Sequence, residues 1–112
     1  MFILKRDGQL VLFDYNKIVN AINKAFIEVD GELYENDTAF DIALEIGRIV
    51  ENSITRMTVE DIQDLVEKYL MRSERPDVAK AYIRYRYKKE VAREFKSDFI
   101  DAIGEKLEAR NV

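Results

Sequence analysis

The sequence has 112 residues, 47% of them hydrophobic and 36% charged, which is enough for one folded domain with a single core. It contains neither cysteine nor histidine, which excludes disulfides and cysteine-based zinc sites and argues against covalent or metal-dependent hydrolysis. The net charge of −4 argues against binding to nucleic acid, except through a strongly local basic patch.

The sequence also bears on location. None of its apolar runs approaches the roughly 20 residues that cross a bilayer. The N-terminus lacks the apolar region and the cleavage site of a signal peptide. We therefore expect a cytoplasmic protein that makes no use of a membrane.

The first predicted element is a β-hairpin centred on Asp7-Gly8. Short apolar and β-branched runs flank this dipeptide, and Asp-Gly supplies the positive φ angles of a two-residue type I′ turn. Asp14 follows the second run and can cap a helix. The apolar residues that then recur at helical spacing are Ile18, Ile22, Ala25, Phe26 and Val29.

Three cations fall around the start of this helix. Lys5 and Arg6 lie beside the predicted turn, and Lys17 lies in the first helical turn, where free backbone N–H groups and the macrodipole favour an anion. They are interpreted either as an anion site or as ordinary solvated cations. A lysine in a first turn is mildly unfavourable against the macrodipole, which favours a functional reason for Lys17.

A polar loop over residues 30–37 leads to a second predicted helix, capped by Asp37 or Thr38 and ending near Ser53. Its expected buried stripe consists of Phe40, Ala43, Ile46, Val50 and Ile54. Residues 54–57 are too few for a helix. They are interpreted either as a third, edge strand beside the hairpin or as a plain connection.

Two further helices are predicted. Thr58 and Asp61 have the spacing of a capping box, and the third helix ends between residues 72 and 75. Pro76 suits the first turn of a fourth helix, which we expect to continue to Ser97-Asp98. The tail beyond is predicted to be a weak helix that Gly104 interrupts. Its apolar residues are Phe99, Ile100, Ile103 and Leu107.

Two other clusters have competing interpretations. Residues 80–89 interleave basic and aromatic side chains, as in single-strand nucleic-acid sites, but on a helix these side chains spread around the circumference. Packing on the core with polar tips outward is therefore the favoured interpretation. Glu60, Asp61 and Asp64 suit either a hydrated Mg²⁺ or an acidic first helical turn, and we favour the helical turn.

Four stretches, in this order along the chain, resemble the ATP-cone, a small regulatory nucleotide-binding domain of ribonucleotide reductases and of a related transcriptional repressor. The last of them most resembles the anaerobic, glycyl-radical class of ribonucleoside-triphosphate reductase. The four stretches are Lys5-Arg6-Asp7-Gly8, Phe13-Asp14-Tyr15-Asn16-Lys17-Ile18, Thr58-Val59-Glu60-Asp61-Ile62-Gln63 and Val78-Ala79-Lys80-Ala81-Tyr82-Ile83-Arg84-Tyr85-Arg86.

The resemblance implies an α+β fold, a bundle of about four helices capped by a small β-sheet, with the nucleotide between sheet and bundle. In the family pattern three cations hold the triphosphate with an aspartate near it, and two isoleucines pack on the adenine. A glutamine makes a polar contact to the nucleotide, and a later lysine binds phosphate. The corresponding residues here are Lys5, Arg6, Lys17, Asp14, Ile3, Ile22, Gln63 and Lys89.

The implied function is allosteric. ATP, bound together with Mg²⁺, leaves a reductase active, and dATP switches it off. Residues 1–96 would form the cone, and residues 97–112 a helical linker toward a catalytic domain that is not in this sequence. The cone would not be an enzyme by itself. Its expected partners are adenine nucleotides, the reductase's catalytic domain and other cones in a homo-oligomer. The alternatives are a free-standing helical oligomerisation module and the nucleotide-sensing part of a repressor.

Overall fold

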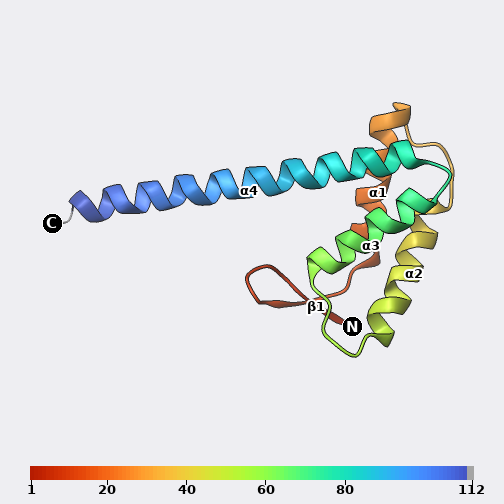
Figure 1. Cartoon of the computed structure of the whole chain (residues 1–112), viewed down its shortest axis with the longest axis horizontal. Coiled ribbons are helices and arrows are strands. Elements are labelled where there is room, and N and C mark those ends of the chain that lie inside the picture. Colours follow the sequence, from red (N-terminus) through yellow and green to blue (C-terminus); the bar gives the residue numbers. More distant parts are fainter. Residues whose placement is uncertain (111–112) are drawn as a thin grey trace. The chain divides into compact units, whose positions relative to one another are not determined.

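The computed structural model describes the backbone of residues 1–110 and the side chains of residues 1–104. In this part of the chain two short strands precede four helices, which confirms the expected α+β fold (Figure 1). The elements are β1 (Phe2–Leu4), β2 (Leu10–Leu12), α1 (Tyr15–Asp30), α2 (Thr38–Asn52), α3 (Val59–Arg72) and α4 (Pro76–Arg110). The chain divides into two compact units, residues 1–82 and 83–112, whose boundary lies inside α4.

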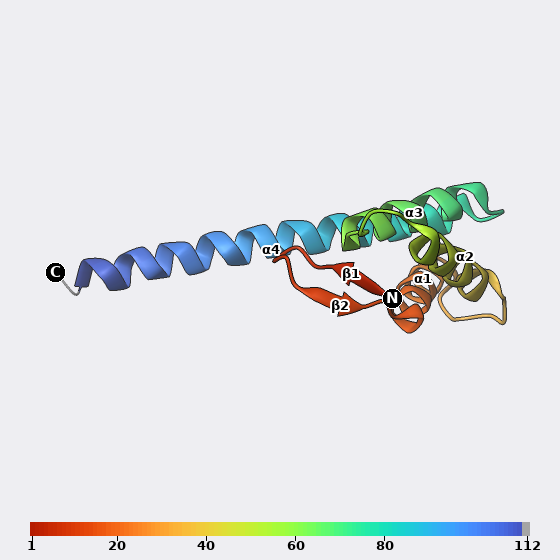
Figure 2. The same ribbon diagram turned by 90° about the horizontal axis from the view of Figure 1, so that it is seen from below.

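The hairpin forms as predicted, but its turn does not. β1 and β2 pair antiparallel (Figure 2), and the Lys5 N–H donates to the Gln9 carbonyl at 2.8 Å. Gly8 has a φ of 85°, whereas no non-glycine residue in the described part of the chain has a positive φ. The predicted type I′ turn, which needs two positive φ angles, is therefore wrong. The loop has three residues, and Gly8 alone supplies its left-handed conformation. The Asp7 carboxylate accepts from the Gln9 N–H at 3.0 Å and helps to fix this geometry.

The first helix begins as the sequence predicts. The Asp14 carboxylate accepts from the Asn16 N–H at 2.9 Å, which satisfies one of the free donors of the first turn. The helix ends at Gly31, whose φ of 84° allows its N–H to donate to the Ile27 carbonyl.

The second helix differs from prediction in its cap and its buried stripe. Asp37 occupies the cap position without a side-chain cap bond, while the Asn36 side chain accepts from the Thr38 N–H at 3.1 Å. Phe40 is exposed, and so is Ile54 beyond the helix end. The stripe instead follows an i, i+4, i+7, i+11 pattern, from which Phe40 is displaced by about 100°. It runs through Ala39, Ala43, Ile46 and Val50.

The segment between α2 and α3 touches the hairpin at one point. The Leu4 N–H donates to the Met57 carbonyl at 3.0 Å, and Leu4 and Thr58 form an isolated parallel bridge. The sheet is two-stranded within the described residues. The segment is therefore a connection, and its bridge ties the start of α3 to the free edge of β1.

The third helix begins with the predicted capping box. The Asp61 N–H donates to Thr58 Oγ1 at 3.1 Å, and the Thr58 N–H donates to Asp61 Oδ2 at 3.0 Å. This reciprocal pair fixes the first turn of α3 close to the hairpin.

One hydrophobic core holds the first unit together. It takes side chains from β1, α1, α2, α3 and the first two turns of α4. Burial of this apolar area is the main favourable term in folding. The side chains with no more than 2% exposure include Ile22, Ala43, Ile46, Val66, Leu70, Val78, Ala79 and Ala81.

Arg75 joins the end of α1 to the start of α4. Its guanidinium donates to both carboxylate oxygens of Asp30, at 2.6 and 3.1 Å, and to Asp77 at 3.1 Å. It also lies 5.6 Å from the centre of the Phe26 ring. These hydrogen bonds raise the pKa of Arg75 and lower the pKa of Asp77. The pairing is bidentate, which gives the strongest geometry available to an arginine and a carboxylate.

The fourth helix continues past the predicted end at Ser97-Asp98. It is an unbroken helix to Arg110, and Gly104 lies inside it. The predicted break is therefore wrong. Serine and aspartate cost only a few tenths of a kcal/mol in a helix, and one glycine costs about 1 kcal/mol, which good helix formers on both sides offset. The expectation that Leu107 belongs to an apolar stripe lies outside the described side chains.

Candidate functional site

The tip of the hairpin lies against the start of α3. Arg6 Nε is 2.7 Å from Glu60 Oε1, and both side chains are partly exposed. The two atoms form an ion pair by distance, although Glu60 Oε1 has no partner with hydrogen-bond geometry. The contact is therefore an ion pair without a directional hydrogen bond. It brings the first and third of the recognised sequence stretches together.

Gln63 lies one helical turn beyond Glu60 on α3. Its Oε1 atom is buried and has no hydrogen-bond partner. A buried carbonyl oxygen without a donor is costly, so most such atoms in folded proteins are satisfied by protein, water or a ligand. Gln63 Oε1 is therefore a buried acceptor without a donor among the described residues.

Lys5 shares one face of the hairpin with Ile3. The two residues are two positions apart, and β1 side chains alternate between faces. Ile3 belongs to the core, so this is the face that covers the helices. Lys5 itself is exposed at the end of that face. The hairpin thus directs a cation toward the edge of the helical bundle.

Asp14 and Lys17 lie at the other end of the hairpin. The Phe13 N–H donates to the Met1 carbonyl at 2.9 Å, which joins the strand ends just before α1. Lys17 is exposed in the first turn of α1, and Asp14 is the cap of that helix. Asp14 therefore has a demonstrated structural role, in addition to the ligand role that the resemblance implies.

The two isoleucines expected to meet adenine are buried. Ile22 has 0% exposure and Ile3 has 9%, and both belong to the same core cluster. A ligand could touch Ile22 only if neighbouring side chains moved. The hairpin contributes Ile3, and it meets the start of α3 through the Leu4–Thr58 bridge and the Arg6–Glu60 ion pair.

Lys89 belongs to the second unit. It is exposed, and its Nζ lies 5.2 Å from the centre of the Tyr85 ring, one turn earlier on α4. This contact confirms that the two side chains share a helix face.

The acidic residues at the start of α3 already have structural roles. Asp61 completes the capping box, and Glu60 pairs with Arg6. Among the described residues no group of three or more carboxylates could hold a metal ion. The geometry thus supports the interpretation as an acidic first turn. The partnership of Glu60 was missed from the sequence, because nothing local relates residues 6 and 60.

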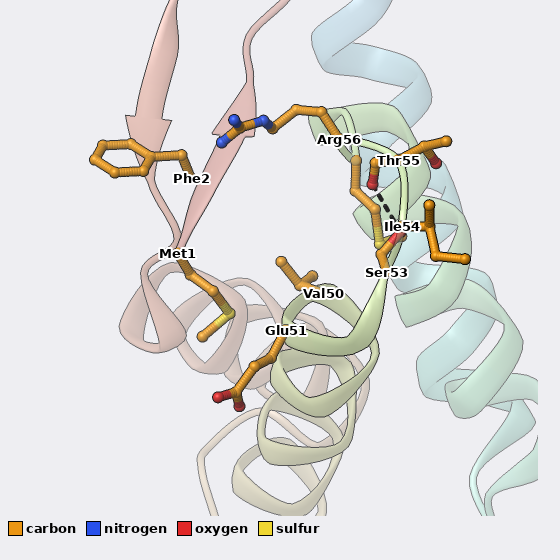
Figure 3. Close-up of a pocket in the computed structure, with 9 residues that line it drawn as sticks. Met1, Phe2, Val50, Glu51, Ser53, Ile54, Thr55 and Arg56 are labelled. Carbon is orange, nitrogen blue, oxygen red and sulfur yellow. Dashed lines mark hydrogen bonds between the residues drawn. The ribbon is translucent and has the colours of Figure 1, made fainter.

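A hollow of about 400 Å³ lies along the free edge of β1 (Figure 3). Its walls come from the start of the chain, the end of α2 and the segment that follows. Arg56 points from that segment toward Phe2. Within the same segment the Ser53 hydroxyl donates a hydrogen bond to the Thr55 carbonyl at 2.7 Å. None of the residues expected to bind nucleotide lines this hollow. We place the candidate site at the hairpin because Lys5 and Arg6 lie at its tip, next to the part of α3 that contains the unpartnered Gln63 Oε1, whereas Lys17 and Asp14 lie at its other end.

Within the residues that the structure describes, no helix is both long and apolar enough to cross a membrane.

Comparison with known proteins gives a consistent result. Residues 1–91 match the ATP cone domain family. The chain is 35% identical, over 98% of its length, to the anaerobic ribonucleoside-triphosphate reductase of Haemophilus influenzae. It is 40% identical, over 84% of its length, to the vitamin B12-dependent ribonucleoside-diphosphate reductase of Thermoplasma acidophilum. It covers only 15% and 12% of these two reductases.

The matched region contains the hairpin, the first three helices and the first turns of α4, and it includes both the residues of the candidate site and those that line the hollow. The similarity extends to anaerobic and vitamin B12-dependent reductases and to the alpha subunit of a third reductase, from Treponema pallidum, and in each the chain corresponds to a small part of the relative. The chain belongs to the ATP-cone family, the nucleotide-binding regulatory domains of ribonucleotide reductases.

Proposed function

We propose that this domain binds ATP and dATP between the hairpin and the helical bundle and controls the overall activity of a ribonucleotide reductase, with ATP permitting activity and dATP stopping it. The observation that carries the proposal is the buried, unpartnered Gln63 Oε1 beside a hairpin that presents Lys5 and Arg6. The family match supplies the nucleotide class.

The residues fit a nucleoside triphosphate. A triphosphate needs several cations in a partly desolvated site, and charge-assisted hydrogen bonds contribute about 1.5–3 kcal/mol each before the costs of association. Lys5 and Arg6 at the tip of the hairpin and Lys17 at its base would supply these contacts to a triphosphate that lies along the hairpin. Lys89 belongs to the second unit, and its part in binding phosphate stays a prediction. Arg6 would exchange the Glu60 carboxylate for phosphate, which its electrostatic contact allows.

The base would be recognised by Gln63 and by apolar packing. The amide oxygen of Gln63 can accept from the exocyclic amino group of adenine, which guanine lacks at that position. Packing on Ile3 and Ile22 requires the hairpin to shift, because both side chains are buried. Nucleotide binding would therefore be coupled to hairpin position, as an allosteric device requires.

Discrimination between ATP and dATP belongs to the same proposal. Phosphate contacts are identical for the two ligands, so selectivity must come from groups near the ribose 2′ position and from two protein states with different affinities. Mg²⁺ would arrive with the nucleotide, since the described carboxylates do not form a metal site.

The proposed partners follow from the relatives. Each is a reductase of which this chain covers about an eighth to a seventh, so the regulated partner would be the catalytic part of such an enzyme. We also propose that the protein forms homo-oligomers through its cones and that it is cytoplasmic. In this view the domain performs no chemistry itself.

The test is calorimetric titration of the chain with ATP, dATP and GTP in the presence of Mg²⁺. We expect both adenine nucleotides to bind and GTP to bind much more weakly. Lys5→Ala and Lys17→Ala should each lower ATP affinity at least tenfold, because each removes a charge-assisted contact. Lys68→Ala, at an exposed position of α3, is the matched control and should leave the affinity unchanged.

Circular dichroism of each variant shows whether the helices are intact. Equal ATP affinity in both site variants and the wild type would refute the site. Absence of any nucleotide binding by the folded chain would refute the proposal for this domain acting alone.

A further inference from the structure

Exposed apolar side chains recur at every fourth position along the second unit's part of α4. This ridge consists of Ile83, Tyr87, Val91, Phe95, Phe99 and Ile103, all of them exposed. Phe95, at its centre, is 73% exposed. Residues four apart are offset by about 40° around a helix, so the six side chains form a ridge about 30 Å long that winds about 200° around the helix and is centred on Phe95. Figure 1 shows this segment as unbroken helix. Continuous apolar surface of this extent marks an interaction site.

The charged side chains on either side of the ridge are sorted by sign. Helical geometry at about 100° per residue places Glu94 on one side of Phe95 and Lys96 on the other. The carboxylates between residues 83 and 104 all fall on the Glu94 side, at Glu90, Glu94, Asp98 and Asp101. The Lys96 side carries Lys89, Arg93 and Lys96. The ridge therefore separates an acidic flank from a basic flank.

We propose that two copies of this chain pair through the ridge, parallel to each other, with Phe95 of one copy against Phe95 of the other. In a parallel two-fold pair, each flank of one helix faces the opposite flank of its partner. The acidic flank then meets the partner's basic flank, and Glu94 comes near Lys96 of the second copy. An antiparallel pair would place acidic flank against acidic flank. Charge complementarity thus selects both the partner, a second copy, and its direction.

The four-residue spacing of the ridge also determines the angle at which the two helices cross. Ridges of residues four apart interlock best when the two helices cross at about 50°. Contact is then concentrated within about two turns of the crossing point. Arg84 and Lys88 lie within about 20° of the line through Phe95, so the ridge is most purely apolar from Val91 onward. A contact of this size supports a weak dimer that depends on concentration.

This inference does not depend on nucleotide binding, because none of the residues that its experiments change, Val91, Glu94, Phe95, Lys96, Ser97 and Phe99, is assigned to the nucleotide. It also names a surface distinct from the hairpin and the helical core. The competing occupant is another part of a longer reductase chain, and the experiments below separate the two.

Sedimentation equilibrium of the complete 112-residue chain is the first experiment. We expect a monomer–dimer equilibrium without added nucleotide, weakened at least tenfold by Phe95→Glu. Ser97→Glu adds the same charge on the opposite side of the helix and is the matched control, expected to dimerise like the wild type. A chain that stays monomeric at millimolar concentration would overturn the proposal and leave the ridge to another part of a longer protein. Equal dimerisation of the Phe95→Glu variant would overturn it as well.

Charge reversal tests the flanks. Glu94→Lys should weaken the dimer severalfold, because lysine would then face Lys96 of the partner. Adding Lys96→Glu should restore the dimer, since the pair is re-formed with opposite polarity. Failure of the double variant to recover, with its helix content intact, would contradict the proposed arrangement.

Cysteine cross-linking tests the direction. The natural chain has no cysteine, so a single introduced thiol reports one position. In the parallel pair Val91→Cys alone, and Phe99→Cys alone, should each form a disulfide-linked dimer under mild oxidation. Cross-linking only in a mixture of the two variants would show an antiparallel pair and refute the proposal.

Discussion

At the scale of single residues, the ion pair between Arg6 and Glu60 lies in the proposed binding site. The carboxylate lies 2.7 Å from the arginine that the proposed function assigns to phosphate. A triphosphate must compete with Glu60 for Arg6 and is also repelled by it. Glu60 therefore sets a threshold for binding, and its removal should favour the ligand.

We expect Glu60→Gln to raise ATP affinity about three- to tenfold, by freeing Arg6 and removing a negative charge from the site. Isothermal titration of the variant and the wild type at equal ionic strength measures this. Asp64→Asn, one turn further along α3, removes a charge from the same helix and is the control. A loss of affinity in Glu60→Gln would show that the carboxylate helps to bind the nucleotide.

Gln63 illustrates a different contribution. Its buried oxygen has no donor among the described residues, although most buried acceptors in folded proteins are paired. Binding sites commonly contain such groups, since satisfying them contributes to specificity for one ligand. The residue is thus better explained by what it could accept than by what it contributes to the fold.

At the scale of elements, α1 and α2 meet at Gly47. A Cβ atom built on Gly47 would lie 2.5 Å from the Tyr15 ring and hydroxyl, so the glycine allows the close approach of Tyr15. The Tyr15 ring is also fixed by an edge-to-face contact with Phe13, with ring centres 4.8 Å apart. The start of α1 and the middle of α2 therefore depend on each other.

We predict that Gly47→Ala lowers the free energy of unfolding by about 1–3 kcal/mol, because the added methyl group displaces Tyr15. In the Tyr15→Ala background the same change should instead stabilise by up to about 1 kcal/mol, the normal helix-propensity gain of alanine over glycine. Urea unfolding of the four proteins measures the coupling. An equal effect of Gly47→Ala in both backgrounds would contradict the proposed close contact.

The junction of α1 and α4 depends on Arg75, which binds Asp30 and Asp77 together. The hydrogen bond from Arg75 lowers the folded-state pKa of Asp77 below its ordinary value. Its stabilising contribution is therefore complete at neutral pH and is lost as the pH falls through the lowered folded-state pKa.

We predict that Asp77→Asn is less stable than the wild type at pH 7 and that the difference shrinks below about pH 4 as the wild-type carboxylate becomes protonated. Urea unfolding at several pH values measures it. Asp41→Asn, an exposed position in the first turn of α2, provides the comparison. A stability difference that did not change with pH would exclude the Asp77 charge as its cause.

At the scale of the whole molecule, ligand binding and folding are linked. A ligand that binds only the folded domain raises the free energy of unfolding by about 2.7 kcal/mol when its concentration is 100 times Kd. Because the hairpin contributes Ile3 to the core and Lys5 to the site, the proposed nucleotide would stabilise the unit that contains both. Stability therefore reports binding without any reductase present.

We expect ATP with Mg²⁺ to raise the melting temperature of the wild type, while GTP at the same concentration does so far less. In Lys5→Ala the stabilisation by ATP should be smaller by about 1.4 kcal/mol for each tenfold loss of affinity. Differential scanning fluorimetry with matched salt measures both. Equal stabilisation by ATP and GTP would argue against an adenine site.

Local sequence determined the parts of this protein whose causes are local. Asp14 caps α1, Thr58 and Asp61 form the capping box, and Pro76 begins α4, as predicted, because caps and first turns involve residues only two to four positions apart. The apolar periodicity of α1 and α3 likewise identified most of their buried faces. The family resemblance rested on these same short stretches and was confirmed.

Where several local solutions had similar energies, the sequence did not choose between them. Asp7-Gly8 suits two hairpin turns, and the pairing of Lys5 with Gln9 selected the one with a single positive φ. Ser97 and Gly104 only weaken a helix, so the predicted break did not occur. The assigned nucleotide roles of Lys5 and Lys17, and the boundary at residue 96, stay predictions.

Only the tertiary structure decided which distant residues meet. Arg6 pairs with Glu60, Arg75 joins Asp30, and Tyr15 rests on Gly47, although no local pattern relates the members of any pair. The missing hydrogen-bond partner of Gln63 Oε1 was equally invisible in the sequence. Local hydrogen bonds and periodicity fix the elements, whereas these contacts depend on how the elements pack, and packing is set by the whole chain at once.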